Sequence, residues 1–271
     1  MQFEQEGCRW FVDRKVRPES LARIERACHQ AGRGFEIIRV DRGAGRPAID
    51  HPTPVPGQPF VLYGYASLLI AASADPAWRA GVFYDGALFR PSVYLANWGA
   101  ERMLNHDAGT MTLGEFLDPG PPAGDGPWFI RPDDDLKPFA GGVVTRASLP
   151  AILAAEPGGI PPLSTPVLVA RPKKLGSEWR LFVVDGGIVA QSCYTGDGFD
   201  RPVPPELRDF ARDAVRAWSP APAFALDVTV TEKGSPRIIE ANCINGTGFY
   251  HADVGAVVHA LSRYQELTWP A

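Results

Sequence analysis

Two carboxylates near the C-terminus, Asp227 and Glu240, have the spacing needed to face each other in a β-hairpin. Two runs of β-branched and apolar residues flank a Glu-Lys-Gly-Ser turn, a pattern typical of a hairpin. If the turn is centred between residues 233 and 234, Asp227 lies directly opposite Glu240. Side chains alternate along a strand, so Thr229 and Asn242 share their face. Like charges with side chains roughly 5 Å apart repel unless a cation lies between them. Carboxylate and amide oxygens suit Mg²⁺ beside a phosphate, so Asp227, Glu240 and Asn242 form a candidate metal site.

The opposite face of this hairpin is apolar and is expected to lie in the core. Its members are Leu226, Val228, Val230, Ile239 and Ala241. The same alternation also fits a half-exposed hairpin whose carboxylates pair with Lys233 or Arg237. The hairpin alone therefore does not decide between a metal site and an ordinary exposed strand pair.

Cations suited to a polyphosphate occur about 100 residues earlier. A strand-like segment reaches Arg131 and is followed by Lys137 and a glycine pair at 141–142. Guanidinium, ammonium and free backbone N–H groups together can hold phosphate oxygens. The alternative is a solvated strand end and loop. The aspartates at 133–135 are expected to cap a turn or face water, because further anions would repel a phosphate.

Three further features lie between and after these segments. An apolar run predicts a buried strand made of Val167, Leu168, Val169 and Ala170. Glu178 and Arg180 are two residues apart in a strand-like segment and therefore share a face, where they also fit a plain cross-strand salt bridge. A glycine-rich turn after the acidic hairpin could bind a substrate through backbone amides or be a simple loop; its candidate residues are Asn245, Gly246 and Gly248.

Composition sets broad limits on the function. The chain has 271 residues, enough for a buried core, and a formal net charge of −4. It lacks the basic stripe that neutralises a nucleic-acid backbone, so no nucleic-acid partner is expected. Four scattered cysteines, no signal-peptide pattern and no apolar stretch long enough to span a bilayer predict a cytoplasmic protein without a membrane partner.

A proline- and glycine-rich segment at 118–127 marks the expected domain boundary. Residues 1–124 are predicted to form a smaller α/β domain, with a helix at 19–30 and strands at 35–40 and 59–63. Residues 125–271 are predicted to form a second domain of mixed α and β structure. Its expected hairpin at 179–194 turns at residues 185–187, and its last helix covers 252–265.

Taken in order, these motifs resemble the ATP-grasp superfamily, and within it the clade named for two arginines and a lysine. The resemblance covers about residues 127–250 and rests on the patterns F-I-R-P…K-P-F-x-G, E-x-R and D…E-x-N…G-x-G-F-Y. It implies an α+β fold in which two subdomains grip ATP, preceded by a smaller α/β pre-grasp domain. In this chain the strand ends in arginine where many superfamily members have lysine, and the glycine-rich phosphate loop is short.

The resemblance also implies roles for the candidate residues. Arg131 and Lys137 would contact phosphates, and the strand 167–170 would meet adenine through its backbone. Arg180 would lie near the γ-phosphate, with Glu178 meeting the ribose or positioning Arg180. Asp227, Glu240 and Asn242 would hold Mg²⁺.

These roles lead us to expect an ATP- and Mg²⁺-dependent ligase that joins a carboxylate to an amine or thiol through an acyl phosphate. Its partners would be a small-molecule or peptide carboxylate and an amine acceptor. Two alternatives remain open on the sequence: a small-molecule kinase on the same fold, and a nucleotide-binding protein without turnover. Product analysis separates the first two, because a ligase forms an amide and a kinase a phosphorylated product.

Overall fold

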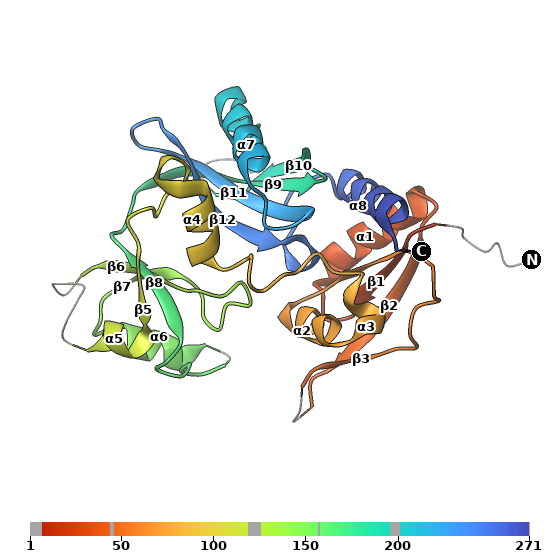
Figure 1. Ribbon diagram of the computed structural model, residues 1–271, viewed down its shortest axis with the longest axis horizontal. Helices are drawn as coiled ribbons and strands as arrows, with labels where there is room; N and C mark the ends of the chain where they lie inside the picture. The colour runs from red at the N-terminus through yellow and green to blue at the C-terminus, as the bar shows by residue number, and fades with distance from the viewer. Residues whose placement is uncertain (1–6, 44–45, 119–125, 157, 196–200, 271) are drawn as a thin grey trace, which may run out of the picture.

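The structure, a computed structural model, describes residues 7–43, 46–118, 126–156, 158–195 and 201–270. Its strands form three four-stranded sheets that occupy three parts of an elongated molecule (Figure 1). The fold is mixed α+β, as the sequence predicts. None of the helices in these ranges is both long and apolar enough to cross a membrane.

The N-terminal sheet has the order β3-β2-β1-β4. Its strands are β1 (Arg9–Asp13), β2 (Gly34–Asp41), β3 (Ala48–Asp50) and β4 (Phe60–Tyr63). β1 runs parallel to β2 and β4, and such strands are buried on both faces. Trp10 and Val12 accordingly pack on one side of β1, while Phe11 packs on the other.

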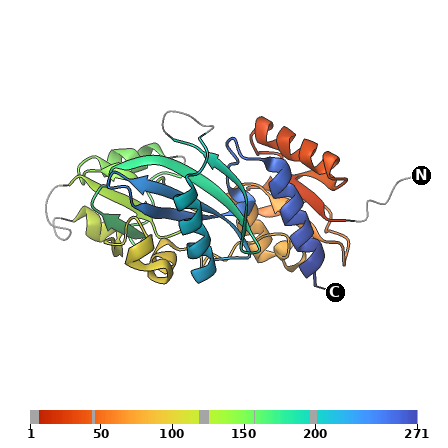
Figure 2. The same ribbon diagram turned by 90° about the horizontal axis from the view of Figure 1, so that it is seen from above.

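Helices from both ends of the chain cover the N-terminal sheet. They are α1 (Pro18–Gln30), α2 (Ala66–Ala74), α3 (Pro76–Arg79) and α8 (Val254–Thr268). α1 and α8 lie side by side on the face that buries Trp10 (Figure 2). Trp10 donates its indole N–H to the hydroxyl of Ser262 in α8 at 2.9 Å, so the last helix is fixed to the N-terminal sheet.

The central sheet is antiparallel and has the order β10-β9-β11-β12. Its strands are β9 (Leu175–Val184), β10 (Gly187–Cys193), β11 (Ala223–Thr231) and β12 (Pro236–Cys243), followed by the short 3₁₀ turn η1 (Ile244–Gly246). The predicted hairpin at 179–194 is confirmed: Asp185 and Gly186, with φ of 49° and 72°, form the two-residue turn that an Asp-Gly pair favours. Helices α4 (Pro91–Arg102) and α7 (Pro205–Ala217) pack on this sheet.

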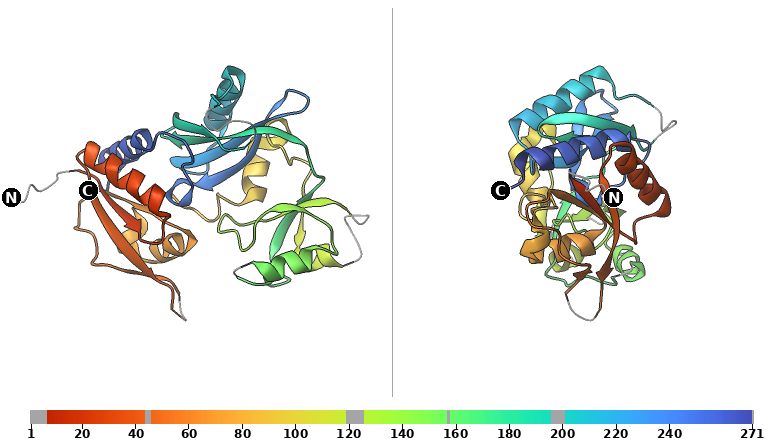
Figure 3. Two further views of the ribbon diagram at one scale, coloured as in Figure 1. Left: turned by 180° about the vertical axis from the view of Figure 1, so that it is seen from behind. Right: turned by 90° about the vertical axis from the view of Figure 1, so that its right-hand side faces the viewer.

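The small sheet has the order β5-β8-β6-β7. Its strands are β5 (Gly109–Thr112), β6 (Trp128–Pro132), β7 (Gly142–Val144) and β8 (Pro166–Ala170), and its helices are α5 (Leu113–Leu117) and α6 (Leu149–Ala155). Figure 3 shows this sheet and the central sheet joined by the chain that runs from β8 into β9. The expected boundary at 124/125 lies at the edge of a segment outside the described residues. Because β5 precedes that segment and pairs with β8, the small sheet takes strands from both sides, and the two-domain division stays a prediction.

Candidate active site

The opposition of Asp227 and Glu240 predicted from the sequence is confirmed by the strand register. The turn itself differs by one residue, since Thr231 rather than Glu232 bonds across it to Ser235. A β-bulge between the turn and the carboxylates restores the predicted pairing. The bulge also corrects one expected core residue: Ile238 is fully buried, whereas Ile239 is partly exposed.

Arg180 lies beside Asp227 because β9 is the other neighbour of β11, with Asp227 paired to Arg180 in the register. The guanidinium Nε and Nη2 donate to the two carboxylate oxygens at 2.8 and 2.7 Å, a bidentate geometry. Asn242 adds a third hydrogen bond, from its side-chain N–H₂ to Asp227 Oδ2 at 3.2 Å. Asp227 is 1 % exposed, so this pair is an interior feature of the central sheet.

Glu240 is held by two cations that come from the small sheet. Arg131, in β6, reaches it at 2.8 Å, and Lys137, in the following loop, reaches it at 3.2 Å. Lys137 Nζ also donates to Asn242 Oδ1 at 2.7 Å. The described residues contain no pairing of either carboxylate with Lys233 or Arg237. Candidate residues identified in the sequence thus connect the small sheet to the central sheet through ion pairs.

The pKa values of the two ion-paired carboxylates are shifted in opposite directions. Burial would raise the pKa of Glu240, but Arg131 and Lys137 outweigh it and hold that pKa well below the usual range. Burial raises the pKa of Asp227, against the opposing effect of the Arg180 guanidinium. Sites that perform proton or phosphoryl chemistry often separate the pKa values of neighbouring groups in this way.

Glu178 lies on the same strand as Arg180 and accepts a hydrogen bond from the hydroxyl of Tyr194 at 2.9 Å. Burial raises its pKa, an effect only partly offset by that hydrogen bond. The Tyr194 ring stacks on Tyr250 with centroids 4.9 Å apart, and Arg180 lies over both rings. No pattern in the sequence marks these two tyrosines as neighbours of Arg180, since only the strand register and the loop bring them there.

Asp135 is a site residue that the sequence did not reveal. It was expected to cap a turn or face water; instead its half-buried carboxylate accepts from the backbone N–H of Cys243 at 3.3 Å. Burial raises its pKa to about 6. Its neighbours differ: Asp133 bonds Arg90 and Ser92, and Asp134 accepts from Leu136 N. Three identical side chains in a row give no signal of which one contacts the end of β12.

The strand 167–170 is β8, fully within the small sheet and paired with β5 on one edge and β6 on the other. Those ladders occupy the backbone groups of its inner residues. Free backbone groups therefore concentrate beyond Ala170, in the connection 171–174 that leads to β9.

The glycine-rich turn divides into an anchoring residue and a surface loop. Asn245 is 1 % exposed, and its side chain bonds the backbone of Leu62, Gly81 and Phe83. This residue joins the turn to β4 and to the segment that follows α3. Gly246 and Gly248, by contrast, line a cavity. A side chain at Gly246 would come within 2.9 Å of the Gly64 carbonyl, so glycine permits the close approach.

The donor set fits a hard divalent cation together with phosphates. Asp227 and Glu240 supply carboxylate oxygens and Asn242 an amide oxygen, all within one hydrogen-bonded group. The described residues hold no cluster of three or more His, Cys, Asp and Glu side chains suited to a metal, so the third protein donor would be the amide. In the structure these oxygens accept from Arg131, Lys137 and Arg180, the cations that suit phosphate.

Comparison with known proteins identifies the fold. A family model for the ATP-grasp domain, family 3 of the clade named for two arginines and a lysine, matches residues 87–261. Among solved structures, ATP-grasp ligase PsnB, complexed with a minimal precursor, is 15% identical and covers 95% of this chain and 99% of its own, with a TM-score of 0.57. D-cycloserine synthetase DcsG is 16% identical, with coverage of 97% and 100% and a TM-score of 0.56.

A third similar structure is the macrocyclase MdnC bound with precursor peptide MdnA from Microcystis aeruginosa MRC. It is 14% identical and covers 94% of this chain and 99% of that chain, with a TM-score of 0.54. At such identities the likeness concerns the fold. The search of curated protein sequences finds no match.

Proposed function

Since this chain belongs to family 3 of the ATP-grasp clade named for two arginines and a lysine, we propose that it is an ATP- and Mg²⁺-dependent ligase that joins a carboxylate to an amine or thiol. One observation carries the proposal: three cations and two carboxylates from two different sheets converge on one point. Arg131 and Lys137 come from the small sheet, and Arg180 and the carboxylates from the central sheet.

ATP would lie between these two sheets, as it does in the family. Its phosphates would take over the hydrogen bonds that Arg131 and Lys137 now donate to Glu240. The adenine would lie against the connection 171–174 and the end of strand 167–170, where backbone groups are free. Glu178 would meet the ribose or, through its shared strand face, position Arg180.

Asp227, Glu240 and Asn242 would hold Mg²⁺, which when bound neutralises phosphate charge and orients the terminal phosphate. Release of Glu240 from Arg131 and Lys137 frees its oxygens for that purpose. Asp227 stays paired to Arg180 through both oxygens, so it would either orient Arg180 or contribute a remaining lone pair.

The chain's own residues would act by positioning and charge neutralisation. A substrate carboxylate oxygen attacks the γ-phosphorus, the bond to the β-phosphate oxygen breaks, and an acyl phosphate and ADP form. An amine then attacks the acyl carbon, phosphate leaves, and the amine loses a proton. Arg131, Lys137 and Arg180 offset the charge that develops on the transferred group.

The similar structures include peptide-bound ligases and a synthetase of a small molecule. We extend this range to the present chain, whose substrate would be a peptide or small-molecule carboxylate with an amine acceptor.

Thermal unfolding with nucleotides tests the proposal. ATP should raise the melting temperature, and Mg²⁺ should raise it further, because ligands that bind only the folded state stabilise it. GTP serves as the comparison nucleotide. ADP release in the presence of candidate carboxylates and hydroxylamine, with formation of a hydroxamate, would support ligation. A stable phosphorylated product without hydroxamate would favour a kinase, and the absence of any nucleotide effect would contradict the proposal.

A further inference from the structure

A cavity of about 490 Å³ lies where the start of α1, the end of β4 and the loop 246–251 meet. This volume is within the range of small-molecule sites, roughly 300–1,000 Å³. Two half-exposed aromatic side chains, Tyr65 and Tyr250, form part of its wall. The cavity is therefore large enough for a molecule of amino-acid to dipeptide size.

The cavity adjoins the reactive arginine. Gly248 lines it, and the carbonyl of Gly248 accepts a hydrogen bond from Arg180 Nη1 at 3.3 Å. Tyr250 also lines it, and its ring lies 5.1 Å from the Arg180 guanidinium. Tyr250 has a φ of 48°, a left-handed backbone that is uncommon for a bulky residue and often occurs at functional sites.

Both walls hold the loop between them in place. Tyr63 donates its hydroxyl to the carbonyl of Thr247 at 2.6 Å, and Arg23 in α1 donates to the carbonyls of Tyr250 and Ala252. The cavity is thus preorganised, which lowers the entropic cost of binding. The Arg23 guanidinium is therefore already hydrogen-bonded to the backbone of this loop.

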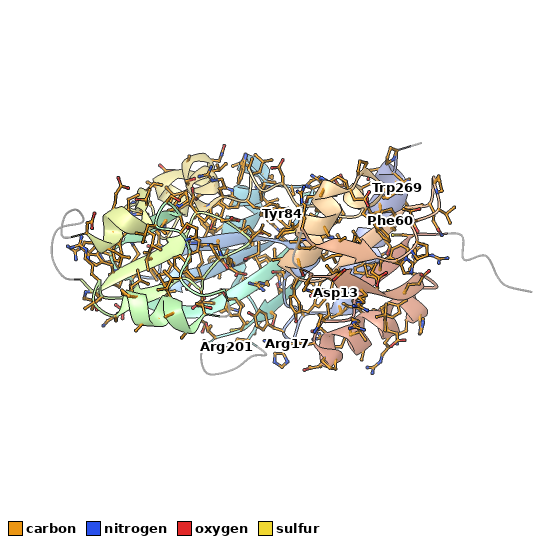
Figure 4. The ribbon with its side chains drawn as sticks, turned by 90° about the horizontal axis from the view of Figure 1, so that it is seen from below. Asp13, Arg17, Phe60, Tyr84, Arg201 and Trp269 are labelled. Atoms are coloured by element: carbon orange, nitrogen blue, oxygen red, sulfur yellow. The ribbon has the colours of Figure 1, made fainter. Side chains whose placement is uncertain are left out.

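Arg17 is the cation that the fold leaves available. It lines the cavity, and within the described residues its side chain makes no hydrogen bond or ion pair. Figure 4 shows Arg17 where the N-terminal part of the chain meets the strands of the central sheet. The wall carries two arginines and one carboxylate, Glu19, an excess of positive charge. A guanidinium fork matches carboxylate and phosphate geometry.

We propose that this cavity binds the acyl donor and that the donor is a small carboxylic acid with a second anionic group, a carboxylate or a phosphate, bound by Arg17. The reacting carboxylate would face Arg180, and the second anion would face α1. The inference rests on the proposed ligase function, because that function makes the Arg180 side the reacting side.

Calorimetric titration of the purified chain with ADP and Mg²⁺ present tests this inference. The probes are glutarate, 3-phosphonopropanoate and pentanoate, which share a similar length and differ in the second anionic group. We expect at least one dianion to bind about tenfold more tightly than pentanoate, as a charge-assisted hydrogen bond implies. The tighter of the two dianions identifies the second group as carboxylate or phosphate.

Two variants make the test specific, one at the residue that precedes α1 and one within α1. Arg17→Gln should abolish the preference for dianions, whereas Arg26→Gln, an exposed position outside the cavity, should retain it. Equal binding of pentanoate and the dianions, an unchanged preference in Arg17→Gln, or no binding of any probe would overturn the inference. A titration with ADP is measured first and tests the ligase proposal separately. If ADP does not bind, the ligase proposal is contradicted, whereas a preference for dianions that depends on Arg17 can still be measured.

Discussion

Asp227 and Glu240 lie opposite each other across the β11–β12 ladder, although the turn between them is one residue away from the simplest pairing. The register near the turn joins Val228 to Ile238, and the register at the site joins Asp227 to Glu240. The strand thus has one extra residue, Ile239, between Ile238 and Glu240. As a result Ile238 enters the core while Glu240 faces the site.

Alanine substitutions at these two neighbouring isoleucines test the bulge. Ile238 is fully buried in the core beneath α4 and α7, so Ile238→Ala should lower the free energy of unfolding by about 2–5 kcal/mol. Ile239→Ala should cost clearly less, because that side chain is only partly buried. Urea unfolding of both variants gives the comparison. A larger loss at Ile239 would mean that the hairpin has the unbulged register predicted from the sequence.

Glu240→Gln should abolish the additional stabilisation that Mg²⁺ gives to the ATP-bound protein. The substitution removes the charge that Arg131 and Lys137 contact, while keeping an oxygen acceptor of the same shape. If Glu240 helps to hold the metal, ATP should still raise the melting temperature, but the additional rise from Mg²⁺ should be lost. The variant without ligand should also be less stable, because Arg131 is left buried without its partner.

Glu232→Gln is the matched control for this experiment. Glu232 is exposed at the turn of the same hairpin and pairs only with the exposed Lys174, at 3.7 Å, among the described residues. Its substitution should leave both the stability and the Mg²⁺ effect unchanged. An intact Mg²⁺ effect in Glu240→Gln would rule out the metal role of Glu240.

Much of the candidate site can be read from residue types and order. A D…E-x-N hairpin and an E-x-R strand are local patterns, and strand alternation with the simplest turn places Asp227 and Glu240 on one face, although the protein reaches that pairing through a different turn and a bulge. What cannot be read are contacts set by tertiary packing. Arg131 meets Glu240 only because the small sheet lies against the central sheet, and α8 covers the N-terminal sheet from the other end of the chain.

The contact between Asp135 and the backbone of Cys243 illustrates the same limit. Its two aspartate neighbours bond other partners, and the difference depends on a loop whose path the sequence does not fix.

Arg180→Lys should weaken the fold although it keeps the positive charge. The planar guanidinium donates one hydrogen bond to each carboxylate oxygen of Asp227, and a lysine ammonium cannot reproduce that bidentate geometry. With Asp227 almost fully buried, one lost hydrogen bond should cost about 1–3 kcal/mol. Urea unfolding measures the loss, with Arg212→Lys as control, because Arg212 pairs with Asp209 on the exposed face of α7. Equal effects of the two substitutions would show that the bidentate pair contributes nothing special.

Asp135→Asn should stabilise the ligand-free protein at neutral pH. Burial raises the pKa of Asp135 from its usual 3.8 to about 6. Between about pH 4 and pH 6 the unfolded chain has lost this proton while the folded chain keeps it, so the folded state binds more protons. Stability from this group must therefore fall as the pH rises through that window, by on the order of 3 kcal/mol in total.

Asparagine carries no charge and keeps an oxygen that can accept from the N–H of Cys243. The variant should consequently be more stable than the wild type at about pH 8 and similar to it at about pH 4. Glu240 contributes in the opposite sense, because its lowered pKa gives stability that is present above its ordinary pKa and is lost as the pH falls. Both chains keep Glu240, so the difference between their urea unfolding curves at the two pH values isolates Asp135. A variant that is less stable at about pH 8 would mean that the ionised Asp135 is held by favourable contacts strong enough to outweigh its burial.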